Sequence, residues 1–363
     1  MSAGSYQHGG NPEADFRRLG LAPRDLIDLS VNTNPLGPPD SMQRIWNKAF
    51  RAVRRYPSQE GEALRDFYVR KFSLPHDSIL PGNGSIDLMY LASRVLDFER
   101  AVAPAPSFHD YTRACDTAGK AVDFFQLYAN DGFRLEPGAI AAFARKNGAG
   151  AVFLGNPNNP TGAGLSADSV LEQVDARPEQ VWFVDEAFIQ FVPDIEKATL
   201  LRETALRPNL VVFHSLTKFY AIAGLRAGAA VSHPETIARL RAAAVPWQVN
   251  NVMEACCEAL YDVEAYERET LDLVAREREA VRTALEAVEG IEVYPGRANF
   301  LLFRINVAER ADELMRGMME RGLYLRDCSN FAGLGPGYFR IAITTQERRI
   351  RALQILREAV AAL

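Results

Sequence analysis

Residues 215–226 have the sequence SLTKFYAIAGLR and begin two residues after the short apolar run Leu210 to Phe213. An apolar run of this length, bounded by polar residues, is typical of a strand buried on both faces of a sheet. In an open parallel sheet, ligands bind outside the carboxyl ends of the strands. We therefore expect Ser215, Lys218 and Arg226, which follow the run, to lie at a binding site.

Similar apolar runs recur on both sides of this stretch. They are Ala101 to Ala103, Val122 to Leu127, Ala151 to Leu154, Val181 to Val184, and Ala227 to Val231. Helix-like stretches lie between several of them, at 135–146 and 167–174, and a further amphipathic helix is expected to begin at Asp40. This alternation predicts an α/β fold with a largely parallel central sheet and crossover helices.

The pattern changes beyond Pro246. A long charged helical stretch at 249–288, interrupted near 261–266, is followed by short strand-like and helical segments. These segments are strands at 291–294, 300–305, 324–327 and 338–344, a helix at 311–321, and a closing helix. A chain of 363 residues usually divides into two domains. The sequence therefore predicts a large domain at 41–246 and a smaller α+β domain formed by 1–40 and 247–363.

The composition argues against several classes of partner. The chain has 41 Lys and Arg against 46 Asp and Glu, a net charge of −5, which does not favour nucleic acid or an anionic membrane as the main partner. It contains no apolar run long enough for a membrane-spanning helix, and its N-terminus lacks the features of a secretory signal. We expect a cytoplasmic protein without a metal site. Its four cysteines show no C-x-x-C spacing and are expected to be buried, reduced thiols.

Two more predicted strands end in polar groups. The turn GNPNNPTG at 155–162 follows one strand, and Asp185-Glu186 follows another. Together with Ser215, Lys218 and Arg226, these groups suit pyridoxal 5'-phosphate chemistry. In that chemistry a lysine forms a Schiff base and a carboxylate keeps the pyridine nitrogen protonated. An amide can steady the phenolic oxygen, while hydroxyls, an arginine and the backbone of the loop at 82–85 can hold the phosphate.

Two motif-based alternatives are weaker. The Ser-x-x-Lys spacing also occurs in penicillin-interacting serine enzymes, but no Lys-Thr-Gly follows it here. Gly82-x-Gly84 lacks the third glycine of a dinucleotide-binding fingerprint.

Taken in order, these motifs resemble the fold-type-I pyridoxal-phosphate enzymes of the class I/II aminotransferase superfamily over nearly the whole chain. Within that superfamily, several stretches resemble the L-threonine-O-3-phosphate decarboxylases of cobalamin biosynthesis. These stretches are His8-Gly9-Gly10, SVNTNPLG at 30–37, SLTKFYAIAGLR at 215–226, PWQVN at 246–250, and YPGRAN at 294–299. The histidinol-phosphate aminotransferases are close relatives. Aminotransferases usually have a tyrosine where this chain has Phe188, which favours the decarboxylases.

The resemblance implies a role for each matching residue. Lys218 carries the cofactor, Asp185 pairs with the pyridine nitrogen, Asn159 bonds the phenolic oxygen, and Phe108 stacks on the ring. The cofactor phosphate is assigned to Gly84, Ser85, Ser215, Thr217 and Arg226. Tyr56 reaches the neighbouring site of a homodimer.

The resemblance also implies how a small phosphorylated amino acid is held. Arg340 matches the arginine that binds the substrate carboxylate, and Asn32 lies close to that carboxylate. Arg326 and His8 are candidates for the substrate phosphate. Arginine suits both tasks because its planar fork pairs with two oxygens and keeps its charge.

The expected reaction is decarboxylation of L-threonine O-3-phosphate to (R)-1-amino-2-propanol O-2-phosphate. The main alternative is transamination of histidinol phosphate or a related amino-acid phosphate. A non-catalytic, DNA-binding ligand sensor is a third possibility. However, roughly 40 residues before the first expected helix leave little room for a DNA-binding module.

Overall fold

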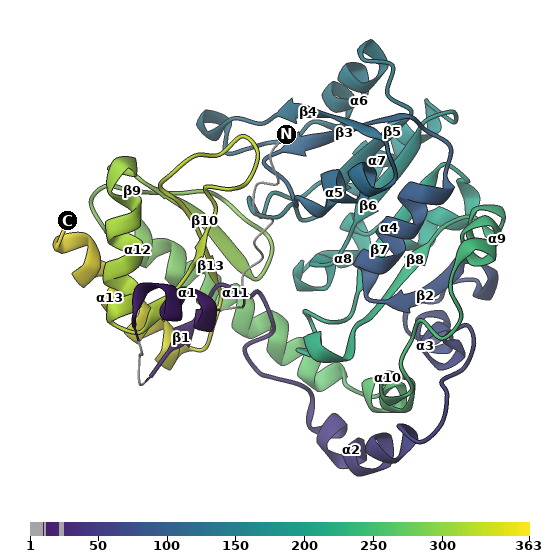
Figure 1. Cartoon of the computed structure of the whole chain (residues 1–363), viewed down its shortest axis with the longest axis horizontal. Helices are drawn as coiled ribbons and strands as arrows, with labels where there is room; N and C mark the ends of the chain where they lie inside the picture. Colours follow the sequence, from purple (N-terminus) through teal and green to yellow (C-terminus); the bar gives the residue numbers. More distant parts are fainter. Residues whose placement is uncertain (1–9, 11, 22–24) are drawn as a thin grey trace.

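The computed structural model describes residue 10 and residues 12–21 and 25–363, and it contains a seven-stranded central sheet (Figure 1). In spatial order the strands are β2 (Ile79–Asn83), β8 (Ala227–Val231), β7 (Leu210–Ser215), β6 (Val181–Asp185), β5 (Ala151–Gly155), β3 (Arg100–Ala105) and β4 (Ala121–Gln126). Strands β3 to β7 run parallel to one another, and β8 is antiparallel to both of its neighbours, β2 and β7. The predicted α/β fold with a largely parallel sheet is therefore confirmed.

Helices cover both faces of this sheet. One face packs against α4 (Ser85–Val95), α5 (Asp110–Thr117) and α9 (Pro234–Ala243). The other packs against α3 (Glu62–Phe72), α6 (Pro137–Lys146) and α7 (Ala167–Asp175). Because successive residues of a strand point to opposite faces, Phe183 joins the first core while Trp182 and Val184 join the second. This double burial explains why these strands appear in the sequence as continuous apolar runs.

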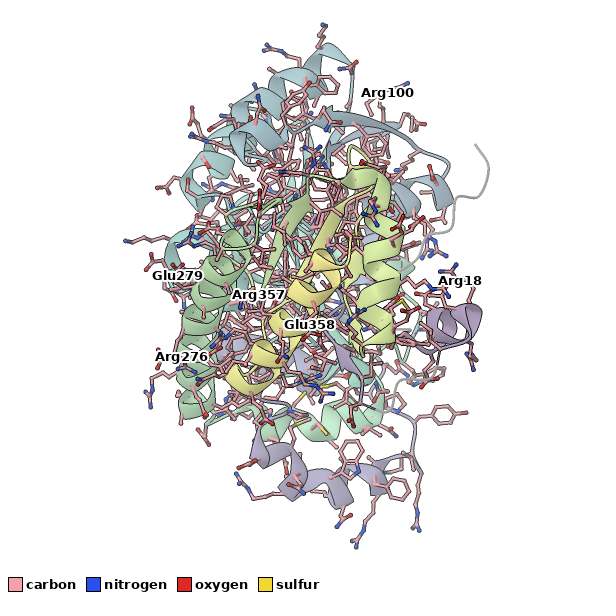
Figure 2. The ribbon with its side chains drawn as sticks, turned by 90° about the vertical axis from the view of Figure 1, so that its left-hand side faces the viewer. Arg18, Arg100, Arg276, Glu279, Arg357 and Glu358 are labelled. Carbon is pink, nitrogen blue, oxygen red and sulfur yellow. The ribbon has the colours of Figure 1, made fainter. Side chains whose placement is uncertain are left out.

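The smaller domain is built on a four-stranded antiparallel sheet. Its order is β12 (Arg326–Asp327), β13 (Tyr338–Ala342), β10 (Phe300–Ile305) and β9 (Ile291–Val293). In Figure 2, α13 (Gln346–Ala361), which carries Arg357 and Glu358, lies between α11 (Glu264–Glu286) and α12 (Ala311–Glu320). These elements match the segments expected beyond residue 290.

The described N-terminal residues return to this smaller domain. Strand β1 (Ile27–Asp28) pairs in parallel with β11 (Leu323–Tyr324), and Phe16 of α1 (Pro12–Leu19) packs against Tyr324. Leu29 joins the core of the smaller domain. The segment after it, residues 30–37, then crosses toward the central sheet.

The division between the two cores falls along α11. Helix α10 (Asn251–Cys256) packs against α2 (Asp40–Ala52) and α3, beside which it lies in Figure 1. Val274 of α11 still belongs to the large core, whereas Val281 belongs to the smaller one. The boundary expected near residue 246 stays a prediction. From this packing we propose that α10 and the first half of α11 belong with the large domain.

Two further observations concern the chain as a whole. Across the part of the chain that the structure describes, no helix is both long and apolar enough to cross a membrane. Cys115, Cys256, Cys257 and Cys328 are all buried and free, and burial raises their pKa values above that of an ordinary thiol.

Candidate active site

A cavity of about 410 Å³ lies beyond the carboxyl ends of β5, β6 and β7 and is bordered by both domains. The predicted residues that line it are Asn32, Ser85, Phe108, Asn159, Asp185, Ser215, Thr217, Lys218, Arg226, Arg326 and Arg340. Gly84 lies directly behind Arg226. His8 lies outside the described residues, and Tyr56 does not line the cavity. The structure thus brings most of the predicted set into one place.

Lys218 lies in the turn that follows β7. Its backbone carbonyl accepts a hydrogen bond from Asn34 N (2.9 Å). Within the described residues, its amine has no hydrogen bond or ion pair. Burial, followed by the positive charges of Arg340 and Arg226, lowers the pKa of this amine to about 8. A lysine in this setting has a much larger neutral fraction near neutral pH than an ordinary lysine, and its neutral amine can act as a nucleophile.

Asp185 ends β6 and is held from two sides. Its Oδ1 accepts from the backbone N of Ala187 (3.1 Å), and its Oδ2 accepts from the hydroxyl of Tyr111 (3.1 Å). Burial raises the pKa of the Asp185 carboxyl to about 6, while these two hydrogen bonds oppose the rise. The sequence analysis missed Tyr111, because a tyrosine inside a helix has no distinguishing sequence signal.

Glu186, the next residue, does not line the cavity. Its carboxylate accepts from the hydroxyl of Thr199 (2.6 Å) and the backbone N of Leu200 (2.7 Å). Burial raises its pKa to about 8. This carboxylate therefore organises the loop beyond β6, and only Asp185 is available for chemistry.

The three asparagines of the 155–162 turn have different tasks. Asn156 donates to Ala198 O and accepts from Leu165 N, and Asn158 donates to Pro106 O and to Thr161. Asn159 instead faces the cavity, where its Oδ1 accepts from Arg340 (2.5 Å). The first two amides shape the turn, and the third lines the cavity.

Gly84, Ser85, Ser215, Thr217 and Arg226 form a small polar cup. Ser85 begins α4, and the hydroxyls of Ser215 and Thr217 lie 2.8 Å apart. Gly84 has a φ of +81°, which favours glycine, and a Cβ there would lie 2.5 Å from a guanidinium nitrogen of Arg226 and force that side chain to shift. Arg226 has no ion-pair partner among the described residues. A helix N-terminus, two hydroxyls and an unpaired guanidinium suit a phosphate group.

Arg340, in β13, is buried but has no carboxylate partner in the described part of the chain. Its Nη2 donates to Ser30 O (2.8 Å), and its guanidinium lies 5.3 Å from the ring centre of Phe300. With its side-chain amide oriented to satisfy both groups, Asn32 accepts from Arg340 Nη1 (3.1 Å). Burial lowers the pKa of Arg340 to about 10. A buried cation surrounded only by neutral acceptors favours binding of an external anion.

Arg326, Phe331 and His109 form another wall. Arg326 donates to Asn330 Oδ1 (2.9 Å), and its guanidinium lies 5.2 Å from the ring centre of Phe331. The ring of His109 is 5.3 Å from that of Phe331 and 5.5 Å from that of Phe108. His109 was not among the predicted site residues, and its position directly after Phe108 was the signal that could have indicated it.

Phe188 lies at the cavity, whereas Tyr56 lies on the surface of the chain. Phe188 lines the cavity and packs edge-on against Phe300, with ring centres 5.1 Å apart. It is thus a core aromatic as well as part of the site. Tyr56 is 82% exposed and packs beside Trp247 at 5.3 Å.

Comparison with known proteins shows the family of this chain. Residues 24–356 match the model of the family "Aminotransferase class I and II", and the chain belongs to this family. It is 32% identical to threonine-phosphate decarboxylase of Salmonella typhimurium, over 99% of this chain and 98% of the relative. It is 33% identical to histidinol-phosphate aminotransferase of Symbiobacterium thermophilum, over 97% of this chain and 95% of that relative. The solved L-threonine-O-3-phosphate decarboxylase of Porphyromonas gingivalis superposes with a TM-score of 0.83 at 25% identity, covering 93% of this chain and 100% of that structure.

The cofactor of this family is pyridoxal 5'-phosphate, and the cavity fits it. The amine of Lys218 is free to attach to an aldehyde, and the Asp185 carboxylate lies on the same cavity surface. The cup around Gly84 and Arg226 has the donors that a phosphate needs. The cofactor expected from the sequence is therefore consistent with the chemistry of the residues present.

Proposed function

We propose that this protein decarboxylates L-threonine O-3-phosphate to (R)-1-amino-2-propanol O-2-phosphate and CO₂, a reaction of cobalamin biosynthesis. The observation that carries the proposal is the placement of three arginines around one cavity. Arg226 lies in the cup, while Arg340 and Arg326 come from the smaller domain. Three anionic groups can then be held at once: the cofactor phosphate, the substrate carboxylate and the substrate phosphate. A phosphorylated amino acid carries both of the last two.

The same cavity supports a role for each residue toward the cofactor. Lys218 would provide the amine for the cofactor aldehyde, Asp185 would pair with the pyridine nitrogen, and Asn159 would bond the phenolic oxygen. Phe108 would stack on the ring. The phosphate would be held by the cup formed by Gly84, Ser85, Ser215, Thr217 and Arg226. When bound, pyridoxal phosphate accepts the electron pair left at the α-carbon when a bond to that carbon breaks.

The chain's own residues decide which bond breaks. Arg340 and Asn32 hold the carboxylate, and Arg326 takes the phosphate at the other end of the substrate. Two fixed ends would set the orientation of the α-carbon and so decide which of its bonds is positioned to break. CO₂ leaves, and a proton takes its place on the α-carbon. Lys218 in its protonated, ammonium form, with a pKa lowered to about 8, is suited to deliver that proton and become the neutral amine.

Transamination of histidinol phosphate is the competing function, favoured by the similarity to the aminotransferases. Two features argue against it. Phe188 lacks the hydroxyl that aminotransferases usually carry there, and histidinol phosphate has no carboxylate to neutralise Arg340. To test this directly, the purified protein is incubated with histidinol phosphate and 2-oxoglutarate. We expect no glutamate above background, and sustained glutamate formation would favour the aminotransferase.

The exposed apolar surface near Tyr56 supports a homodimer. In α2, Trp46 is 47% exposed and Phe50 is 64% exposed, and Val53, directly after the helix, is 55% exposed. Trp247, beside Tyr56, is 46% exposed. An exposed apolar patch of this kind usually marks an interface. We propose that a second copy covers it and that Tyr56 reaches the cofactor phosphate of that copy.

Subunit mixing tests the shared site. Tyr56→Ala and Lys218→Ala chains are each expected to be weakly active at limiting cofactor. In a hybrid dimer, one site combines an intact Lys218 with the partner's intact Tyr56. Random mixing therefore restores about a quarter of the wild-type sites. If the activity of the mixed sample never exceeds the sum of the activities of the two separate variants, Tyr56 does not contribute to the neighbouring site.

Arg340→Met is expected to lower kcat/KM for threonine phosphate by roughly a hundredfold or more, because the substrate carboxylate loses its partner. The same change should raise the melting temperature of the substrate-free protein, because it removes a buried charge that lacks a counterion. Arg349→Met is the matched control, since Arg349 pairs with the buried Glu277 at 2.7 Å. It should lower the melting temperature and leave catalysis nearly intact. Unchanged kcat/KM in Arg340→Met would contradict the assigned role.

A further inference from the structure

Tyr111 is buried directly behind the carboxylate of Asp185. It lies in the first turn of α5, and its side chain is 1% exposed. Its ring stacks on Phe153 with centres 5.4 Å apart and planes 18° apart, and it meets Phe108 edge-on at 5.8 Å. Packing on both sides fixes the direction of the hydroxyl, which donates to Asp185 Oδ2 at 3.1 Å.

The groups around Asp185 have opposing effects on the pKa of its carboxyl. Burial and the negative charge of Asp110 raise the pKa of its carboxyl, whereas the Ala187 amide, the Tyr111 hydroxyl and the charge of Lys218 lower it. Among the described residues, its oxygens accept hydrogen bonds from two of these groups, the Tyr111 hydroxyl and the Ala187 amide. Because the backbone amide is a fixed partner, Tyr111 is the side chain that anchors this carboxylate within the part of the chain that the structure describes.

The hydrogen bond has a definite direction. Burial and the charge of Asp185 raise the pKa of Tyr111 well above that of an ordinary tyrosine. The hydroxyl therefore keeps its proton across the working pH range and donates it to the carboxylate. A donor of this kind stabilises the ionised form of an acid and fixes its rotamer.

We propose that Tyr111 is a positioning residue that keeps Asp185 ionised and aimed at the cofactor's pyridine nitrogen. This inference rests on the proposed role of Asp185 in the function above. Tyr111 itself does not line the cavity, so it acts through Asp185 and not on the substrate. Its loss should therefore affect cofactor binding and kcat, and leave KM for threonine phosphate nearly unchanged.

The sharpest test is a double-mutant cycle on cofactor affinity. Tyr111→Phe keeps the ring and its stacking on Phe153 but removes the hydroxyl. The dissociation constant for pyridoxal phosphate is measured on cofactor-free wild type, Tyr111→Phe, Asp185→Asn and the double variant. We expect Tyr111→Phe to weaken binding about tenfold in the wild-type background and less than about threefold in the Asp185→Asn background. The visible spectrum and kcat are recorded on the same samples.

Tyr220→Phe is the matched control. Tyr220 is equally buried and donates to a different carboxylate, Glu267, at 2.6 Å, outside the cavity lining. It should leave the cofactor dissociation constant and spectrum unchanged. An equal loss of affinity from Tyr111→Phe in both backgrounds, or no loss in either, would overturn the proposal.

The cycle also separates this inference from the function on which it rests. If Asp185→Asn alone leaves cofactor affinity, spectrum and turnover unchanged, the role of Asp185 is wrong and the inference about Tyr111 is overturned with it. If Asp185→Asn has its expected effect and Tyr111→Phe does not, only the inference about Tyr111 is wrong.

Discussion

Lys218→Ala is expected to lower the rate of CO₂ release from threonine phosphate by at least about 10³-fold. The variant loses both the amine that attaches the cofactor and the group that returns a proton to the α-carbon. It should also lack the visible absorbance of the covalently attached cofactor. Turnover is measured from released CO₂, and attachment is measured by mass spectrometry after reduction with borohydride.

Lys120→Ala is the control for this variant. Lys120 is also partly buried, but its amine donates to Leu96 O at 2.5 Å and does not line the cavity. It should retain wild-type turnover and absorbance. Near wild-type activity in Lys218→Ala, with cofactor bound non-covalently, would rule out the central role of this lysine.

Asp185→Asn is expected to reduce kcat by about 10²- to 10³-fold while some cofactor remains bound. A neutral amide cannot stabilise a protonated pyridine nitrogen, so the ring loses much of its capacity to accept electrons. A kcat equal to that of the wild type would show that Asp185 does not face that nitrogen.

The same variant has a predicted signature in the cofactor-free protein. The pKa of Asp185 is raised to about 6, so its contribution to stability is present at low pH and lost as the pH rises through that value. Above pH about 6 the wild type holds a buried charge that Asp185→Asn lacks. The melting temperature of Asp185→Asn relative to wild type should therefore rise between about pH 4 and about pH 6 and stay level above that, measured with both proteins free of cofactor.

Much of the fold was predictable because its strands are buried on both faces. Runs such as Val181 to Val184 have few polar interruptions, and helical stretches separate several of them. Strand β2 was missed because its sequence, ILPGN, contains proline, glycine and asparagine. It forms nevertheless because its backbone pairs with β8 along the whole segment. Helix α10 likewise gave no sign that it packs with the large domain, since the burial of its face depends on α2 and α3.

The candidate site was predictable where a residue follows a strand. Asp185 and Lys218 do so, and their residue types indicate their chemistry. Asn159 could be chosen over Asn156 and Asn158 only by resemblance, because all three share one turn and only tertiary contacts separate their tasks. Tyr111 and His109 were missed for a related reason. At the start of α5, His109 lines the cavity and Tyr111 contacts Asp185 from behind, and the sequence alone does not show which side of that helix faces the cavity.

Phe188 shows how the absence of a single hydroxyl group bears on function. Phe188 fills the same space that a tyrosine would, and its contact with Phe300 needs no hydroxyl. The position is therefore compatible with either reaction as far as packing is concerned. Its bearing on function comes from the hydrogen bond that it cannot make.

The most direct test of the whole account is to incubate the purified, cofactor-loaded protein with L-threonine O-3-phosphate in the absence of any keto acid. Released CO₂ and the phosphorylated amino alcohol are quantified together over many turnovers. The account predicts equal amounts of both, with the cofactor spectrum unchanged at the end. A single turnover that converts the cofactor to its amine form, without CO₂, would identify the protein as an aminotransferase and contradict the account.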